Sequence, residues 1–218
     1  GLMSTLLLAA HGTRHAPGRE CVGRIRDALA TELGKQVVLG WVDVCEPRLE
    51  DLVGDGDVIV PAFLGDGFHV QHDVPQAACR ARDVLVTEHL GTDARVLDAL
   101  DARVREAGGP WPVTVLSWAG SRRRGSREAT ARVAEQMAER WQVEVTMMTP
   151  ATMDETVEVL DPSQAGLATW LLAPGVFSER FAAQGLPCSQ PLAEHPYVVA
   201  ALADLVREIQ RAQEQTAA

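Results

Sequence analysis

No apolar run in the sequence comes close to the roughly 20 residues that a membrane-spanning helix requires. The run at residues 6–10 lacks the length and the basic flank of a secretory signal peptide. Basic residues are also few, 20 against 30 acidic ones, and the formal net charge of −10 disfavours binding to nucleic acid or to an anionic membrane. We therefore expect neither a nucleic-acid nor a membrane partner.

The sequence also contains few cysteines. The sequence has four cysteines and no CxxC pair, which argues against a structural zinc site and favours reduced thiols in the cytoplasm. They are Cys21, Cys45, Cys79 and Cys188.

The remaining composition is that of an ordinary globular protein. The 218 residues are 46% hydrophobic and 23% charged, which suffices for one large domain or two small ones with a buried core. Apolar, strand-like runs alternate with helix-like segments along the whole chain, a pattern typical of parallel sheets covered by helices on both faces. The predicted strands are residues 5–10, 37–44, 58–64, 84–86, 113–118, 143–148 and 168–173.

The chain repeats itself once. HGTRHAPGRE at residues 11–20 aligns with AGSRRRGSRE at residues 119–128, and the two share a glycine, two arginines and a glutamate at matching positions. Two further pairs align in the same order, residues 63–69 with 171–177 and residues 97–106 with 199–208. Three matches in register indicate a tandem duplication.

We therefore predict an α/β fold of two tandem halves that face each other across a cleft. Each half is a doubly wound parallel sheet flanked by helices. The halves are assigned to residues 3–108 and 109–218, with the seam at AGGPWP.

The two halves differ in their histidines. The glycine after the first strand occurs in both, so we attribute it to the backbone geometry of a tight strand-to-helix turn. His11, by contrast, corresponds to Ala119, and His69 corresponds to Phe177. Loss of both imidazoles from one half favours a function for them in the other, although a histidine beside an apolar strand is more commonly a hydrogen-bonded structural residue.

The histidines are predicted to share one edge of the first sheet. Each follows a strand, and the carboxyl ends of parallel strands meet at the edge where such folds bind ligands. Glu46, in VDVCEP, follows the second strand at the same edge. Two imidazoles and a carboxylate could hold a first-row transition metal with open positions. The alternative for Glu46 is a capping role at the helix that Pro47 begins.

Three segments carry a resemblance to a known family. LLLAAHGTR, VIVPAFLGDGFHVQHDVP and LLAPGVFSERFAAQG together resemble the sirohydrochlorin chelatases, the ATP-independent class II cobalt and iron chelatases of the cobalamin and siroheme pathways. The similarity covers nearly the whole chain, in the two-half form of the family. It implies insertion of Co²⁺ or Fe²⁺ into sirohydrochlorin, a tetrapyrrole with eight carboxylates, to give cobalt-sirohydrochlorin or siroheme. The metal is then a substrate, and no permanently bound cofactor is expected.

The resemblance also implies roles for individual residues. His11 and His69 match the histidines of the HG and GxHV motifs, and the acidic metal ligand of some members falls on Glu46. The chemistry agrees, because neutral imidazoles can ligate a metal and accept the protons that leave the pyrrole nitrogens. We expect His11 and His69 to be catalytic, and both to ligate the metal together with Glu46.

The many carboxylates of such a substrate call for cations. Arginines cluster in the loop after the first strand of the second half, and arginine forks suit carboxylates. A solvated loop that opens a helix is the alternative. The expected substrate-binding residues are Arg14, Arg122, Arg123 and Arg124, with Arg127 nearby.

Two other functions are compatible with the sequence. A non-catalytic carrier of metal or tetrapyrrole could use the same histidines. TRHAPG at residues 13–18 also echoes the RHG signature of histidine phosphatases, although it lacks the glycine directly after His15 and that family does not account for the duplication. We expect a cytoplasmic enzyme that works as a monomer on sirohydrochlorin.

Overall fold

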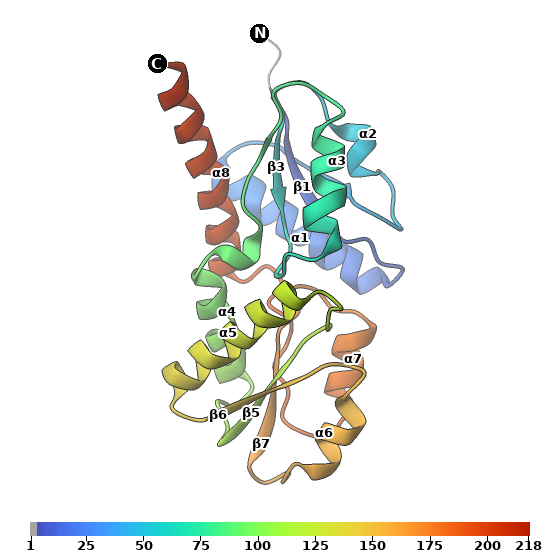
Figure 1. The fold of residues 1–218 in the computed structure, drawn as a ribbon, viewed down its shortest axis with the longest axis vertical. Coiled ribbons are helices and arrows are strands. Elements are labelled where there is room, and N and C mark those ends of the chain that lie inside the picture. Colours follow the sequence, from blue (N-terminus) through green and yellow to red (C-terminus); the bar gives the residue numbers. More distant parts are fainter. Residues whose placement is uncertain (1–3) are drawn as a thin grey trace. The chain divides into compact units, whose positions relative to one another are not determined.

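The computed structural model describes residues 4–218, so Met3, where the first predicted half begins, lies outside the described residues. The chain divides into two compact units (Figure 1). One contains the chain up to Val96 together with Glu194–Ala218, and the other contains Leu97–Ala193. None of the helices in the described part is both long enough and apolar enough to cross a membrane.

The first unit is built on a four-stranded parallel sheet. Its strand order is β2-β1-β3-β4, so β1 lies between two neighbours. Leu6 pairs in register with the first residues of both β2 and β3, which brings the carboxyl ends of the three strands to one edge. The strands are β1 (Leu6–Ala10), β2 (Val37–Trp41), β3 (Val58–Pro61) and β4 (Leu85–Val86).

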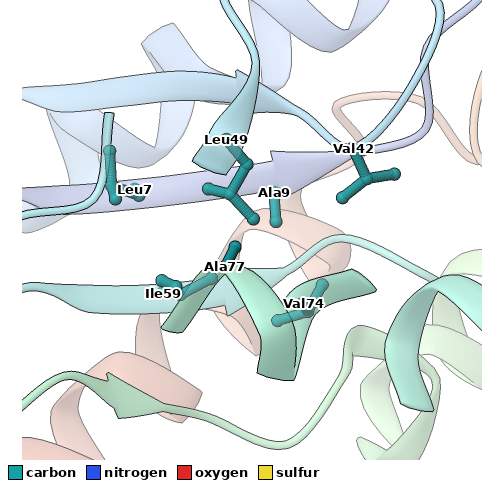
Figure 2. Close-up of a cluster of buried hydrophobic side chains, with 7 residues drawn as sticks. All are labelled: Leu7, Ala9, Val42, Leu49, Ile59, Val74 and Ala77. Atoms are coloured by element: carbon teal, nitrogen blue, oxygen red, sulfur yellow. The ribbon is translucent and has the colours of Figure 1, made fainter. Parts of the chain in front are cut away.

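Helices cover both faces of this sheet. Leu7, Ala9 and Ile59 pack on one face against two short helices (Figure 2), and burial of such side chains is the main favourable term in folding. Two longer helices contact each other on the other side, where they pack against β2 and β3. The short helices are α2 (Leu49–Leu52) and α3 (Val74–Ala78), the long ones are α1 (Ala16–Leu33) and α8 (Pro196–Ala217), and single turns lie at η1 (His69–Asp73) and η2 (Leu90–Thr92).

The second unit has a three-stranded parallel sheet in the order β6-β5-β7. Val115, Leu167 and Phe181 belong to its buried core on one face. The strands are β5 (Val113–Ser117), β6 (Glu144–Met148) and β7 (Ala165–Thr169), and the helices are α5 (Arg124–Trp141), α6 (Met153–Val159) and α7 (Val176–Ala182). The predicted α/β architecture of two parallel sheets is confirmed.

Three strand ends differ from the sequence-based prediction. The second and third strands end earlier than expected, at Trp41 and Pro61, because the chain leaves the sheet to form the loops at its carboxyl edge. The last strand, expected at residues 168–173, lies at Ala165–Thr169. It includes Gly166, whose missing side chain leaves room for the Trp111 ring, since a Cβ there would lie 2.0 Å from that ring. A small residue selected for close packing does not look like a strand residue.

The duplication recurs in the hydrogen bonds. At the start of α1, the side chain of Arg19 donates to the carbonyl of Thr13, and at the start of α5 that of Arg127 donates to the carbonyl of Ser121. The hydroxyls of Thr13 and Ser121 also accept hydrogen bonds, each from the backbone N–H group two positions later. The repeated residues therefore build the same strand-to-helix turn twice.

The compact units nevertheless differ from the sequence repeat by one helix each. Helix α4 (Arg95–Glu106) ends the first repeat, but apart from its first two residues it belongs to the second unit. Its Asp101 accepts a hydrogen bond of 2.7 Å from the indole of Trp141, and Arg103 donates to the carbonyl of Leu192. Helix α8 ends the second repeat and completes the first unit. The predicted boundary at residue 108 follows the repeat, whereas the compact units exchange their last helices.

An arginine fastens α8 within the first unit. Arg95 contacts Asp93 at 2.7 Å and Asp204 of α8 at 2.6 Å. These hydrogen bonds from Arg95 lower the pKa of both carboxyl groups. The ion pair thereby joins the start of α4 to α8, which follows it by about 100 residues in the sequence.

We predict that Leu202→Ala, in α8, destabilises the first unit. Leu202 is fully buried, and removing such a side chain costs about 2–4 kcal/mol of unfolding free energy. Hydrogen exchange should show weakened protection in β1 and β3 while β5 and β7 keep theirs. Gln213→Ala, at the exposed end of the same helix, is the control. Loss of protection in β5 and β7 instead would contradict the exchanged arrangement.

Candidate metal centre

The loop after β1 carries the first histidine to the carboxyl edge of the sheet. His11 directly follows the last residue of β1, and its side chain is 57% exposed. Gly12 lies so close to the neighbouring loop that a Cβ would sit 1.8 Å from the carbonyl oxygen of Asp43. Only glycine permits this approach, which brings the ends of β1 and β2 together. The glycine thus serves a close contact between two loops as well as the turn expected from the sequence.

Two backbone N–H groups, one from each of two loop segments, hold Asp43 in place. Its Oδ1 accepts from the backbone N–H of Gly12 at 2.9 Å and lies 3.0 Å from Nδ1 of His11. Its backbone carbonyl accepts from the N–H of Cys45 at 2.6 Å across Val44, which has a φ of 63°. Such a γ-turn is rare and strained for a β-branched residue, and strain of this kind concentrates at functional sites.

His69 begins a single π-helical turn, η1, an element that is frequent at functional sites. Its Nδ1 lies 2.5 Å from Oδ2 of Asp73, four residues later. An ionised carboxylate is an acceptor only, so Nδ1 donates to Asp73 and Nε2 is the ring nitrogen that faces the other side. The ring of Phe63 stacks on the imidazole of His69, with the two ring centroids 6.3 Å apart.

The three side chains form one cluster. His11, Asp43 and His69 each offer a ligand atom, and these atoms lie within 4.8 Å of one another. The two imidazole rings meet edge to face with centroids 4.6 Å apart. No other group of three or more histidine, cysteine or acidic residues in the described part of the chain could hold a metal ion together.

The electrostatics of the cluster favour a cation. Nε2 of His69 lies 3.5 Å from Oδ2 of Asp43, and a ring nitrogen beside a carboxylate oxygen attracts a positive charge, whether a proton or a metal ion. Two ligands at about 2.1 Å from a tetrahedral ion are about 3.4 Å apart, so a first-row metal fits this spacing. Three protein ligands leave a position open for another molecule.

The structure brings two of the three predicted metal ligands together. His11 and His69 meet as expected, but Glu46 is exposed and lies outside the cluster, where Asp43 supplies the carboxylate. The sequence-based prediction extended β2 to residue 44, which moved the expected edge of the sheet three residues along the chain. The strand in fact ends at Trp41, so the loop begins early and Asp43 is the acidic residue that reaches His11.

The predicted substrate arginines lie in exposed loops. Within residues 4–218, no hydrogen bond or ion pair engages the guanidinium groups of Arg14, Arg122 and Arg123. Arg124 forms an ion pair of 2.7 Å with Glu128 on the surface of α5. Arg14 belongs to the first unit and the other three belong to the second.

The corresponding edge of the second unit has lost every member of the cluster. Ala119 and Phe177 replace the histidines at the aligned positions. The glycine that matches Gly12 is Gly120, and the residue nearest to it across the loop is Thr149 where the first unit has Asp43. The second unit therefore keeps the turn without the metal-binding chemistry.

Sequence reasoning missed two residues of the site, Asp43 and Asp73. A signal for Asp73 was present, because residues four apart on a helical turn face each other, which places a carboxylate beside His69. For Asp43 the sequence contains two acidic residues, three positions apart, after the same strand. Choosing between them requires the true end of the strand.

Comparison with known proteins places this geometry in context. Residues 5–107 match the family model CbiX. A curated sirohydrochlorin cobaltochelatase of Methanothermobacter thermautotrophicus is 23% identical over 130 residues, which make up 47% of this chain and 91% of the relative. A relative of this kind thus corresponds to about half of the present chain.

Solved structures resemble the whole chain. SirB from Bacillus subtilis with Fe³⁺ has a TM-score of 0.78 at 19% identity and covers 95% of both chains. The sirohydrochlorin chelatase SirB of Bacillus subtilis subspecies spizizenii, in complex with cobalt, has a TM-score of 0.79 at 18% identity with the same coverage. At these identities the likeness shows the fold.

The chain thus has the fold of the solved chelatases, and one of its parallel α/β units carries two histidines and a carboxylate that could hold a metal ion. The CbiX match and the cobaltochelatase relative show that the first half of the chain, which carries this geometry, is similar to sirohydrochlorin chelatases.

We predict that Asp43→Asn weakens Co²⁺ binding at least tenfold, because the neutral amide removes the only negatively charged ligand of the cluster. Glu46→Gln, a matched loss of charge three residues away, should change binding less than twofold. Titration of the visible d–d absorption of Co²⁺ measures both constants. A larger effect of Glu46→Gln than of Asp43→Asn would restore Glu46 as the ligand.

Proposed function

We propose that the protein inserts Co²⁺ or Fe²⁺ into sirohydrochlorin. One observation carries this proposal, the cluster of His11, Asp43 and His69 at the sheet edge, in which a ring nitrogen of His69 and a carboxylate oxygen of Asp43 face each other at 3.5 Å. The cobaltochelatase name of the curated relative, and the cobalt and Fe³⁺ complexes of the structural neighbours, support the same reaction.

The cluster suits metal insertion better than permanent metal storage. Three ligands, one of them a well-exposed imidazole, hold an ion less firmly than a closed set of four. An incoming pyrrole nitrogen can take the open position first and then replace the protein ligands one after another. The insertion site is thus also the exit route of the metal.

Proton transfer follows from the same geometry. Insertion of M²⁺ releases two pyrrole N–H protons, while departure of the metal frees the lone pairs of His11 and His69. Each imidazole can take one of these protons, so the metal moves to the macrocycle as the protons move to the protein. Asp43 and Asp73, at 3.0 Å and 2.5 Å from the two rings, stabilise the imidazolium ions that form.

Arginines with free guanidinium groups are proposed to bind the peripheral carboxylates of the substrate. Arg122 and Arg123 precede α5, and Arg14 precedes α1, at the carboxyl edges of their respective sheets. Arg124 can join them because its ion pair with Glu128 is solvent-exposed and such pairs contribute little stability.

Neither alternative function has an observation in its favour. A carrier would be better served by a closed metal site than by one with an open position. The histidine-phosphatase reading depends on His15, which lies at the N-terminal end of α1, outside the His–Asp–His cluster. We further propose that the enzyme acts as a cytoplasmic monomer, with the metal as a substrate and not as a resident cofactor.

We predict that His11→Ala and His69→Ala each reduce metal insertion at least 100-fold, because each removes a metal ligand and a proton acceptor. The measurement is the anaerobic absorbance change of sirohydrochlorin with Co²⁺ or Fe²⁺, corrected for the spontaneous reaction. His15→Ala is the control in the same loop and should keep most of the activity. Near wild-type rates in both variants, with unchanged circular dichroism, would contradict the proposed function.

We predict that replacing Arg122 and Arg123 together by glutamine raises the KM for sirohydrochlorin several-fold and leaves kcat nearly unchanged. The double variant should also lose much of the salt dependence of KM, because charged contacts between exposed groups are screened by salt. Arg132→Gln, an exposed arginine further along α5, is the control. An unchanged KM and salt dependence would leave the loop a solvated helix start.

A further inference from the structure

An exposed aromatic ring lies beside the cluster of His11, Asp43 and His69. Phe68 precedes His69 in sequence, and it is 60% exposed. Its ring stacks on that of His72 with centroids 4.6 Å apart and an angle of 29° between the planes. The same ring meets His69 edge to face at 6.2 Å.

The backbone of η1 produces this arrangement. Residues four apart on the turn form two neighbouring pairs, Phe68 with His72 and His69 with Asp73. The second pair orients the metal ligand, and the first holds the phenyl ring in one orientation although it faces solvent. A ring fixed in this way loses little conformational entropy when it contacts a ligand.

A second apolar side chain flanks the other part of the cluster. Val44 follows Asp43 and is 56% exposed, in a conformation with positive φ that a branched residue adopts only at a cost. Single exposed apolar residues are common on protein surfaces. Here, however, one such residue directly adjoins each of two members of the His–Asp–His cluster in the sequence.

The chemistry of a tetrapyrrole accounts for this distribution. Its metal-accepting nitrogens lie at the centre of a flat conjugated ring, and its carboxylates lie at the periphery. A protein that delivers a metal to the centre therefore benefits from apolar groups next to the metal site. Offset and edge-to-face contacts between flat conjugated systems add to the hydrophobic gain.

We propose that Phe68, backed by His72, is the stacking platform for the macrocycle of the substrate. The inference rests on the proposed chelatase function and adds the residue that positions the ring plane over His11, Asp43 and His69. Phe68 is in this assignment a substrate-binding residue, separate from the groups that hold the metal.

The test compares Phe68→Ala with Phe68→Tyr and measures two binding constants for each full-length protein. The dissociation constant of metal-free sirohydrochlorin should rise about tenfold in Phe68→Ala and return to within twofold of wild type in Phe68→Tyr. The dissociation constant of Co²⁺ alone should stay unchanged in both variants. Val159→Ala is the control, because Val159 is an exposed apolar residue that lines a groove with Val113 and Glu144, at the amino ends of β5 and β6.

The outcomes separate this inference from the proposed function. If wild-type protein inserts metal and Phe68→Ala binds sirohydrochlorin as tightly as wild type, the platform is refuted and the chelatase stands. If Phe68→Ala loses Co²⁺ binding as well, Phe68 supports the metal site through His69 and the platform is again refuted. If wild-type protein binds no sirohydrochlorin, both proposals fail.

The support from His72 can be measured independently. His72→Ala should raise the dissociation constant of sirohydrochlorin about threefold, since the phenyl ring loses its partner but remains in place. His72→Phe retains a flat ring for the stack and should restore binding. Equal binding by all three proteins would show that Phe68 does not need His72, which overturns that part of the proposal.

Discussion

The contact between Gly12 and the backbone of Asp43 is the constraint on which the rest of the site depends. It closes the gap between the loops after β1 and β2, so that the Asp43 carboxylate reaches both the N–H of Gly12 and the ring of His11. The strained turn at Val44 then aims the second carboxylate oxygen at His69. A side chain at position 12 would separate the loops and disperse the cluster.

The arrangement balances attraction against release. A carboxylate and two imidazoles can attract a divalent ion, and the contact of Nδ1 with Asp73 turns Nε2 of His69 toward the cluster. The exposed position of His11 and the missing fourth ligand keep this attraction moderate. The second unit has a related parallel sheet without these groups, so only one copy of the duplicated unit carries the proposed site.

Local patterns in the sequence predicted much of the structure. Apolar runs located the parallel strands, and the replacement of both histidines in the second repeat singled out His11 and His69. Asp43 was missed because the strand before it ends three residues earlier than its apolar residues suggest. The last strand was displaced because Gly166 serves packing against Trp111. Both errors come from contacts between distant residues, which periodicity does not encode.

The sequence repeat could not predict that α4 and α8 are exchanged between the two units, for a related reason. Both helices occupy equivalent positions in the repeat, so the repeat itself does not show which unit each one joins. The choice is made by partners far away in sequence, such as Arg95 for Asp204 and Trp141 for Asp101.

The exchange also sets an order of events during synthesis on the ribosome. The first unit lacks α8 until Glu194–Ala218 has emerged, whereas all parts of the second unit are present by Ala193. The first-made sheet must therefore wait, with the face that α8 covers incomplete, while the later-made unit can finish folding. In this protein the unit with the proposed metal site begins before the second unit and is completed after it.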